Sequence, residues 1–162
     1  CPHCAHFQSY ADKLKASLPK DAQFVLMPAD FEAGWSLFSR AFYTAKALGL
    51  VAQTHQALFD ALHRDHRPLQ RLDQLADFYA EHGADKDTFL STAQSFVIDG
   101  DLANAHRMEM AYGIDSTPTL IIDGKYRVVA DSERGIGFQQ MVQIALQLID
   151  QELAAKHHAT HK

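Results

Sequence analysis

The chain has 162 residues, of which 47% are hydrophobic, so one compact domain can bury a core of ordinary size without a stabilising disulfide or metal. Its formal net charge is −5 and its lysines and arginines form no concentrated run, which argues against nucleic acid as a partner. The apolar runs, such as Leu120–Ile122, are far shorter than the roughly 20 residues of a membrane span, and we expect a soluble domain.

The first segment is predicted to form a helix followed by a strand. Apolar residues recur there at the spacing of an amphipathic helix that begins at or beside the first cysteines: Phe7, Ala11, Leu14 and Leu18. Pro19 helps to end this helix. The next run, Ala22–Met27, is mostly apolar and carries no charge, which predicts a buried strand.

The stretch from Trp35 to about Tyr112 shows only helical periodicity, which predicts an inserted helical subdomain. Apolar residues mark three helices: Trp35, Phe38, Phe42 and Ala45; Val51, His55, Leu58, Phe59 and Leu62; and Leu72, Leu75, Ala76 and Tyr79. Gly49 and Gly83 stand where helix ends favour glycine. Asp85 is suited to cap a helix that includes Phe89 and Phe96, and another helix is expected over about 101–112. We expect five phenylalanines to contribute to the core: Phe38, Phe42, Phe59, Phe78 and Phe96.

The last segment is predicted to form a hairpin and a closing helix. Two short strands, Thr119–Ile122 and Tyr126–Val129, flank Asp123-Gly124, a dipeptide that favours a type I′ turn. Apolar residues then repeat at helical spacing: Phe138, Met141, Val142, Ala145, Leu148, Ile149 and Leu153. Residues 156–162 are expected to be a polar, frayed tail.

The cysteine pair in Cys1-Pro2-His3-Cys4 carries the clearest chemical signal. Exchange of disulfides near neutral pH requires a cysteine that loses its proton readily. Cys1 is placed at the N-terminus of the first helix, where unpaired N–H groups and the helix dipole stabilise an anion, and His3 is a nearby donor. Cys4, one turn further, is the natural resolving thiol, and Pro2 stiffens the spacer. We therefore predict a redox-active pair.

Structural and metal-binding roles for these residues are the alternatives. A disulfide between Cys1 and Cys4 would close almost no chain and would add little stability. A zinc site would have to recruit histidines from elsewhere, because the chain has only two cysteines. The pair His157 and His161 has suitable spacing but lies far along the chain in the polar tail, and His63 with His66 is most simply a solvated helix end. We expect no metal site.

The segment Ser116-Thr117-Pro118-Thr119 precedes the first hairpin strand. An ordinary trans proline is permitted at the start of a strand. However, a C-x-x-C at the start of a helix, followed by a strand and a distant T-P-T before a hairpin and a final helix, resembles the thioredoxin plan. With Cys1-Pro2-His3-Cys4 and a helical insertion, the chain closely resembles the DsbA family of periplasmic disulfide oxidases of Gram-negative bacteria. The resemblance extends from Cys1 to about Leu153 and includes Ile122-Asp123-Gly124-Lys125-Tyr126.

The resemblance implies an α/β, thioredoxin-like fold with an inserted all-helical subdomain. Its core would be 1–31 with 114–155, and the insertion 32–113. It also implies a cis bond before Pro118, with the Thr117 backbone pairing with an extended client segment beside Cys1. The expected activity is disulfide formation in reduced secreted proteins in the periplasm by a monomer. A DsbB-like membrane oxidase would reoxidise the protein, and no cofactor beyond the Cys1–Cys4 disulfide is implied.

The sequence departs from the family pattern in two ways. Family members usually carry a β-strand before the first cysteine, and none is present in this chain, so we expect the sequence to be trimmed. Relatives also often place a lysine in the strand after the first helix, whereas Phe24–Met27 carries no charge, which leaves open how Cys4 loses its proton.

Three other functions compete with the oxidase. An isomerase or reductase of the same fold would differ in redox potential. DsbA-like glutathione-dependent isomerases typically have serine at the position of Cys1. A metal-binding or client-holding module would involve no catalysis. The Cys-Pro-His-Cys sequence favours the oxidase.

Overall fold

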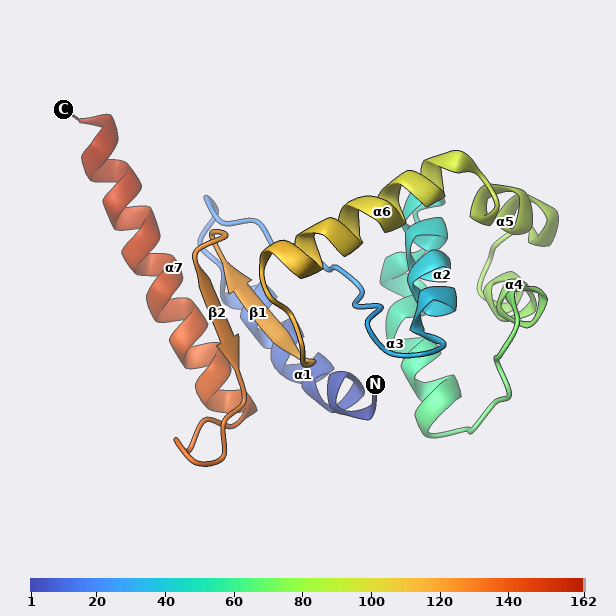
Figure 1. Ribbon diagram of the computed structural model, residues 1–162, viewed down its shortest axis with the longest axis horizontal. Coiled ribbons are helices and arrows are strands. Elements are labelled where there is room, and N and C mark those ends of the chain that lie inside the picture. Colours follow the sequence, from blue (N-terminus) through green and yellow to red (C-terminus); the bar gives the residue numbers. More distant parts are fainter. Residues whose placement is uncertain (162) are drawn as a thin grey trace. The chain divides into compact units, whose positions relative to one another are not determined.

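The computed structural model describes residues 1–161, which divide into two compact units (Figure 1). One unit joins Cys1–Leu26 to the chain from Tyr112 onward, and the other comprises Met27–Ala111. No helix among the described residues is long and apolar enough to cross a membrane.

The first unit combines two helices with a two-stranded antiparallel sheet. Its elements are, in chain order, α1 (Pro2–Ser17), β1 (Thr119–Ile122), β2 (Tyr126–Val129) and α7 (Phe138–Thr160). The two strands pair from Thr119 opposite Val129 to Ile122 opposite Tyr126. The predicted hairpin is therefore confirmed.

The turn between the strands has the geometry that its sequence predicts. Asp123 and Gly124 have φ values of 52° and 66°, and a type I′ turn requires positive φ at both central residues. The Lys125 N–H donates to the Ile122 carbonyl at 2.9 Å, which closes the turn.

The core of the first unit holds the helices against the hairpin. It contains Phe7, Ala11 and Leu14 from α1, Ile122 and Val128 from the strands, and Met141 and Ala145 from α7. Edge-to-face ring contacts join Phe138 to Phe7 and to Tyr10, with ring centroids 5.2 and 5.7 Å apart. The start of α1, which carries both cysteines, is thus anchored to the start of α7.

A network of charged side chains also ties the hairpin to α7. Glu152 is only 7% exposed, and its carboxylate accepts hydrogen bonds from Lys125 Nζ at 2.5 Å and from the Tyr126 hydroxyl at 3.1 Å. Asp123 at the turn pairs with Lys156 Nζ at 2.7 Å. A buried carboxylate needs such partners to offset its lost hydration.

The second unit is entirely helical. Its elements are α2 (Trp35–Ala47), α3 (Val51–His63), α4 (Leu72–Glu81), α5 (Lys86–Ala93) and α6 (Phe96–Ala111). Gly49 and Gly83 follow the caps of α2 and α4 with φ of 71° and 101°, the left-handed conformation that glycine adopts most easily. The Asp85 side chain caps α5 by accepting a hydrogen bond from Thr88 N–H at 2.8 Å, as predicted.

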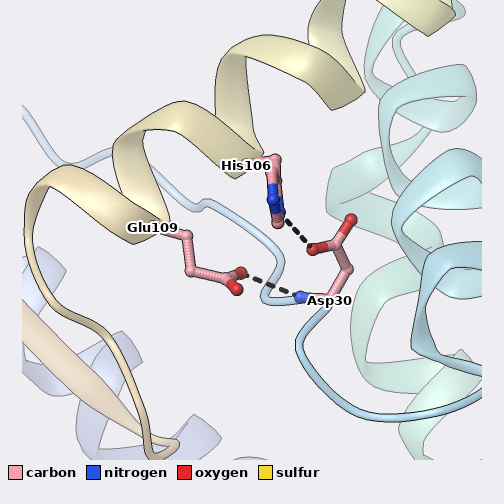
Figure 2. Close-up of side chains that lie close together, drawn as sticks. All are labelled: Asp30, His106 and Glu109. Carbon is pink, nitrogen blue, oxygen red and sulfur yellow. Dashed lines mark hydrogen bonds and ion pairs between the residues drawn. The ribbon is translucent and has the colours of Figure 1, made fainter.

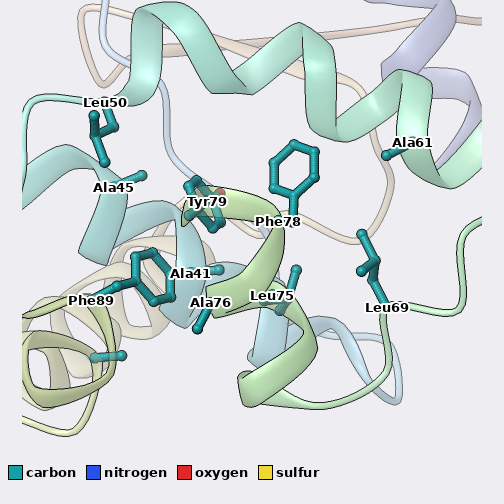
Figure 3. Packing of buried hydrophobic residues seen from close by; sticks show 11 residues of the cluster. Ala41, Ala45, Leu50, Ala61, Leu69, Leu75, Ala76, Phe78, Tyr79 and Phe89 are labelled. Carbon is teal, nitrogen blue, oxygen red and sulfur yellow. The ribbon is translucent and has the colours of Figure 1, made fainter. Parts of the chain in front are cut away.

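The helical unit has its own hydrophobic core (Figure 3). Phe78, Phe89 and Leu75 are at most 1% exposed and lie at its centre. The helices surround these side chains because their apolar residues recur every three to four positions and so face inward. A smaller cluster joins Tyr43 of α2 to Ile98 and Ala105 of α6.

Three predictions about the elements are wrong. The run Ala22–Met27 forms no strand, and Val25 within it is 64% exposed. A strand exists only through hydrogen bonds to a neighbour, and within the described residues the sheet contains only β1 and β2. The helix capped by Asp85 ends at Ala93, and Phe96 instead begins α6 and is 84% exposed rather than in the core.

The third error concerns the closing helix. α7 continues to Thr160, so the tail expected to fray from Lys156 is helical through that residue. Two side-chain contacts support this last part: Lys156 pairs with Asp123, and His157 Nε2 lies 3.7 Å from a carboxylate oxygen of Asp21. Lys162 lies outside the described residues.

Candidate active site

The site begins with Cys1, which is the N-cap of α1. Pro2 occupies the first turn, where its missing N–H is not needed by the helix. The Cys1 Sγ accepts a hydrogen bond from the Cys4 backbone N–H at 3.3 Å. Sulfur therefore takes the place that an aspartate or serine oxygen usually holds at a helix N-terminus. The unpaired N–H groups and the positive end of the helix dipole favour a thiolate there, as the sequence analysis expects.

The loop before β1 supplies a second donor to Cys1. The Thr117 hydroxyl donates to Cys1 Sγ at 3.1 Å, and the Thr117 carbonyl oxygen lies 3.9 Å from the same sulfur. The peptide bond between Thr117 and Pro118 is cis, which confirms the prediction, and the predicted contact between this loop and the cysteine pair is also confirmed. The side-chain donor was not predicted, because the family resemblance implies a role only for the Thr117 backbone.

The second cysteine differs from the first in its environment. Burial raises the pKa of the Cys4 thiol, and the nearby Thr117 side chain opposes that effect in part. No disulfide joins the two sulfurs in this structure. The pair is therefore asymmetric: Cys1 has two donors directed at its sulfur, whereas the environment of Cys4 favours the neutral thiol.

His3 lies on the exposed side of the helix start. Among the described residues it makes no hydrogen bond to Cys1 or Cys4, so the structure shows no direct contact for the donor role expected of His3. It lines a surface hollow of about 220 Å³ with residues from the loop before β1, the end of β2 and the start of α7: Ser116, Thr117, Pro118, Val129, Ala130 and Phe138. The hollow places apolar and backbone groups beside the predicted redox residues.

This arrangement can carry out thiol–disulfide exchange. Contacts of this kind keep a larger fraction of the Cys1 thiol ionised at neutral pH, and only the thiolate can attack a disulfide. They also make Cys1 a good leaving group, because they stabilise the charge that its sulfur acquires on departure. The second thiol is one helical turn away and can close the disulfide.

Comparison with known proteins identifies the family. The family model described as DSBA-like thioredoxin domain matches residues 34–147. The thiol:disulfide interchange protein DsbA of Pseudomonas aeruginosa is 37% identical over 155 residues, which cover 96% of this chain and 72% of that protein. DsbA of Azotobacter vinelandii is 35% identical over 156 residues, with coverage of 96% and 72%.

Solved structures agree with this assignment. The crystal structure of Pseudomonas aeruginosa DsbA matches with a TM-score of 0.89 at 36% identity, covering 97% of this chain and 81% of that one. The oxidoreductase DsbA from Xylella fastidiosa matches with a TM-score of 0.87 at 33% identity, covering 95% and 81%. The fold is therefore the thioredoxin-like fold of these proteins with its helical insertion, as the sequence analysis expects. The chain belongs to the DsbA family of thiol:disulfide oxidoreductases.

Proposed function

We propose that the protein donates the Cys1–Cys4 disulfide to reduced secreted proteins through a mixed disulfide. The observation that carries this proposal is the pair of donors on Cys1 Sγ, the Cys4 N–H at 3.3 Å and the Thr117 hydroxyl at 3.1 Å. They stabilise the thiolate of the reduced protein and have no comparable charge to stabilise in the disulfide. The reduced state is thereby favoured, and a disulfide whose reduced state is favoured is a strong oxidant.

The exchange proceeds in two displacements. A client thiolate attacks Cys1 Sγ, so a bond forms between the client sulfur and Cys1 while the Cys1–Cys4 bond breaks. Cys4 leaves as a thiolate and takes up a proton, in keeping with the raised pKa of this half-buried thiol. A second client thiolate then attacks the client sulfur of the mixed disulfide, and Cys1 leaves as a stabilised thiolate. Two electrons pass from the client to the cysteine pair.

The loop at Thr117 and Pro118 is the proposed place of client binding. Both residues line the hollow beside His3, and Thr117 contacts the attacked sulfur directly. An extended client segment can pair with the backbone of Thr117, which gives affinity through main-chain hydrogen bonds that do not depend on client sequence. Such binding suits a catalyst that acts on many unfolded proteins.

The setting of the reaction follows from the family. We propose that the protein works as a monomer in the periplasm of a Gram-negative bacterium and that a DsbB-like membrane oxidase restores its disulfide. The reaction itself requires only two sulfur atoms, so no cofactor besides the Cys1–Cys4 disulfide is proposed.

A redox titration against glutathione tests the direction of the reaction. We expect a potential near about −120 mV, the known value for a DsbA protein, and rapid oxidation of a reduced two-cysteine peptide by the oxidised protein. C1S should abolish that oxidation. A potential near about −270 mV, the thioredoxin value, would mean that the protein is a reductase and would overturn the proposal.

A further inference from the structure

Three side chains with metal-ligating atoms converge within the helical unit (Figure 2). One ligand atom from each of Asp30, His106 and Glu109 lies within 4.8 Å of the other two. His106 and Glu109 are three residues apart on α6, a spacing that places both side chains on one face of a helix. Asp30 belongs to the segment that precedes α2. Figure 2 shows the side chain of each residue directed toward this common point.

The burial of Glu109 is a second, independent observation at this group. The residue is only 4% exposed, and its one hydrogen bond among the described residues comes from the Asp30 backbone N–H to Oε2 at 3.0 Å. No lysine or arginine of the described chain pairs with this carboxylate. A buried carboxylate with a single neutral donor is costly, because one hydrogen bond replaces only part of its lost hydration.

The geometry of the other two ligands fits direct coordination. His106 Nδ1 lies 3.4 Å from Asp30 Oδ1. Two ligand atoms bound to one tetrahedral zinc ion at about 2.0–2.1 Å are separated by about 3.3 Å. The two residues form an imidazole–carboxylate contact at this distance (Figure 2), and the same separation suits two ligands of one ion. The side chain of His106 is 57% exposed and that of Asp30 is 19% exposed, so an ion can reach the group from solvent.

We propose that Asp30, His106 and Glu109 bind a divalent transition-metal ion of the zinc class. Two carboxylate oxygens and one imidazole nitrogen are donors that such ions accept, whereas Ca²⁺ and Mg²⁺ prefer oxygen ligands alone. Three protein ligands leave the fourth position of a tetrahedral ion for water. The bound ion provides the Glu109 carboxylate with a positively charged partner. It also links the segment before α2 to α6 inside the helical unit.

Calorimetric titration of the oxidised protein with Zn²⁺ tests this site. Oxidation is necessary because both sulfurs are then held in the disulfide and cannot ligate the metal. We expect one equivalent of Zn²⁺ to bind, and we expect H106A and E109Q each to weaken this binding by at least about tenfold. H106A removes an exposed side chain, so its folded state should persist even if E109Q destabilises the unit.

The matched control is the triple variant H157A/H158A/H161A. It removes the exposed histidines of the C-terminal segment, including His157, which faces Asp21 in a similar imidazole–carboxylate contact but without a buried carboxylate. This variant should keep the one equivalent of bound Zn²⁺, and Zn²⁺ should raise its melting temperature as it does that of the wild type. The proposal is overturned if the oxidised protein binds no Zn²⁺, if H106A and E109Q leave the affinity unchanged, or if the triple variant loses the site.

Discussion

Replacement of Thr117 by valine isolates one of the two contacts on Cys1. Valine has nearly the shape of threonine but no hydroxyl, so T117V removes the donor that lies 3.1 Å from Cys1 Sγ. A hydrogen bond to a charged group contributes about 1.5–3 kcal/mol. At 1.36 kcal/mol for each pH unit, the midpoint of the pH dependence of Cys1 alkylation should rise by about 1–2 units. The same loss should make the redox potential more negative by about 30–60 mV, because 30 mV corresponds to about 1.4 kcal/mol for this two-electron couple.

The assay is the rate of iodoacetamide alkylation as a function of pH in a C4A background, where Cys1 is the only thiol. The Cys4 backbone N–H survives that substitution, so the helix contact is retained. T119V is the matched control, because Thr119 lies two residues further on, at the start of β1, and its hydroxyl donates to the Ser116 carbonyl at 2.7 Å and not to a sulfur. Equal alkylation profiles for T117V and its parent, or an equal effect of T119V, would refute the role assigned to the hydroxyl.

Three further predictions concern stability, each measured by urea unfolding. F89A should lower the free energy of unfolding of the helical unit by about 3–5 kcal/mol, because Phe89 is fully buried; a much smaller loss would show that this core is loosely packed. E152A should cost about 1–3 kcal/mol by leaving the Tyr126 hydroxyl without its acceptor and Lys125 with only the more distant Asp123, whereas E133A, at an exposed position, should cost little. D85A should destabilise α5 near neutral pH, because the Thr88 N–H hydrogen bond lowers the pKa of Asp85. That contribution to the free energy of unfolding is present above the ordinary carboxyl pKa and is lost as the pH falls through the pKa of Asp85 in the folded protein. The free energies of unfolding of wild type and D85A should therefore converge in acid, and a difference that persists there would contradict the prediction.

The features that could be predicted from the sequence depend on residues close to one another along the chain. The Asp85 cap, the left-handed Gly49 and the turn at Asp123-Gly124 are each specified within a few residues, and the structure contains all three. Cys1 is at a helix N-terminus for the same reason, since the apolar spacing that marks α1 begins just after it.

The errors arise where distant contacts decide the structure. The apolar run Ala22–Met27 has strand composition, yet a strand needs a partner, and composition alone cannot show whether one is available. Apolar spacing also failed at Phe96, where a short break in the helix turns the side chain to the surface. The end of α7 was missed because its last residues are polar and are held by Asp123 and Asp21, which are distant in sequence.

The candidate site shows the same division. Cys1, Cys4 and His3 are adjacent in a recognisable motif, and Thr117 and Pro118 were located through the family resemblance. The contact between the Thr117 hydroxyl and Cys1 joins residues 116 positions apart, so it cannot be predicted from a pattern of neighbouring residues in the sequence. Asp30 and His106 are 76 positions apart, and their proximity to Glu109 appears only in the folded chain.

The central claim is that the protein stabilises the Cys1 thiolate more than it stabilises the disulfide. Thermal unfolding of the reduced and oxidised forms at neutral pH tests it most directly. The reduced form should melt at the higher temperature, because it alone gains from the charge on Cys1, while the very short loop closed by the disulfide offers little stability. The difference should shrink as the pH falls, since protonation of the native thiolate removes the stabilised charge. A higher melting temperature for the oxidised form would contradict the account.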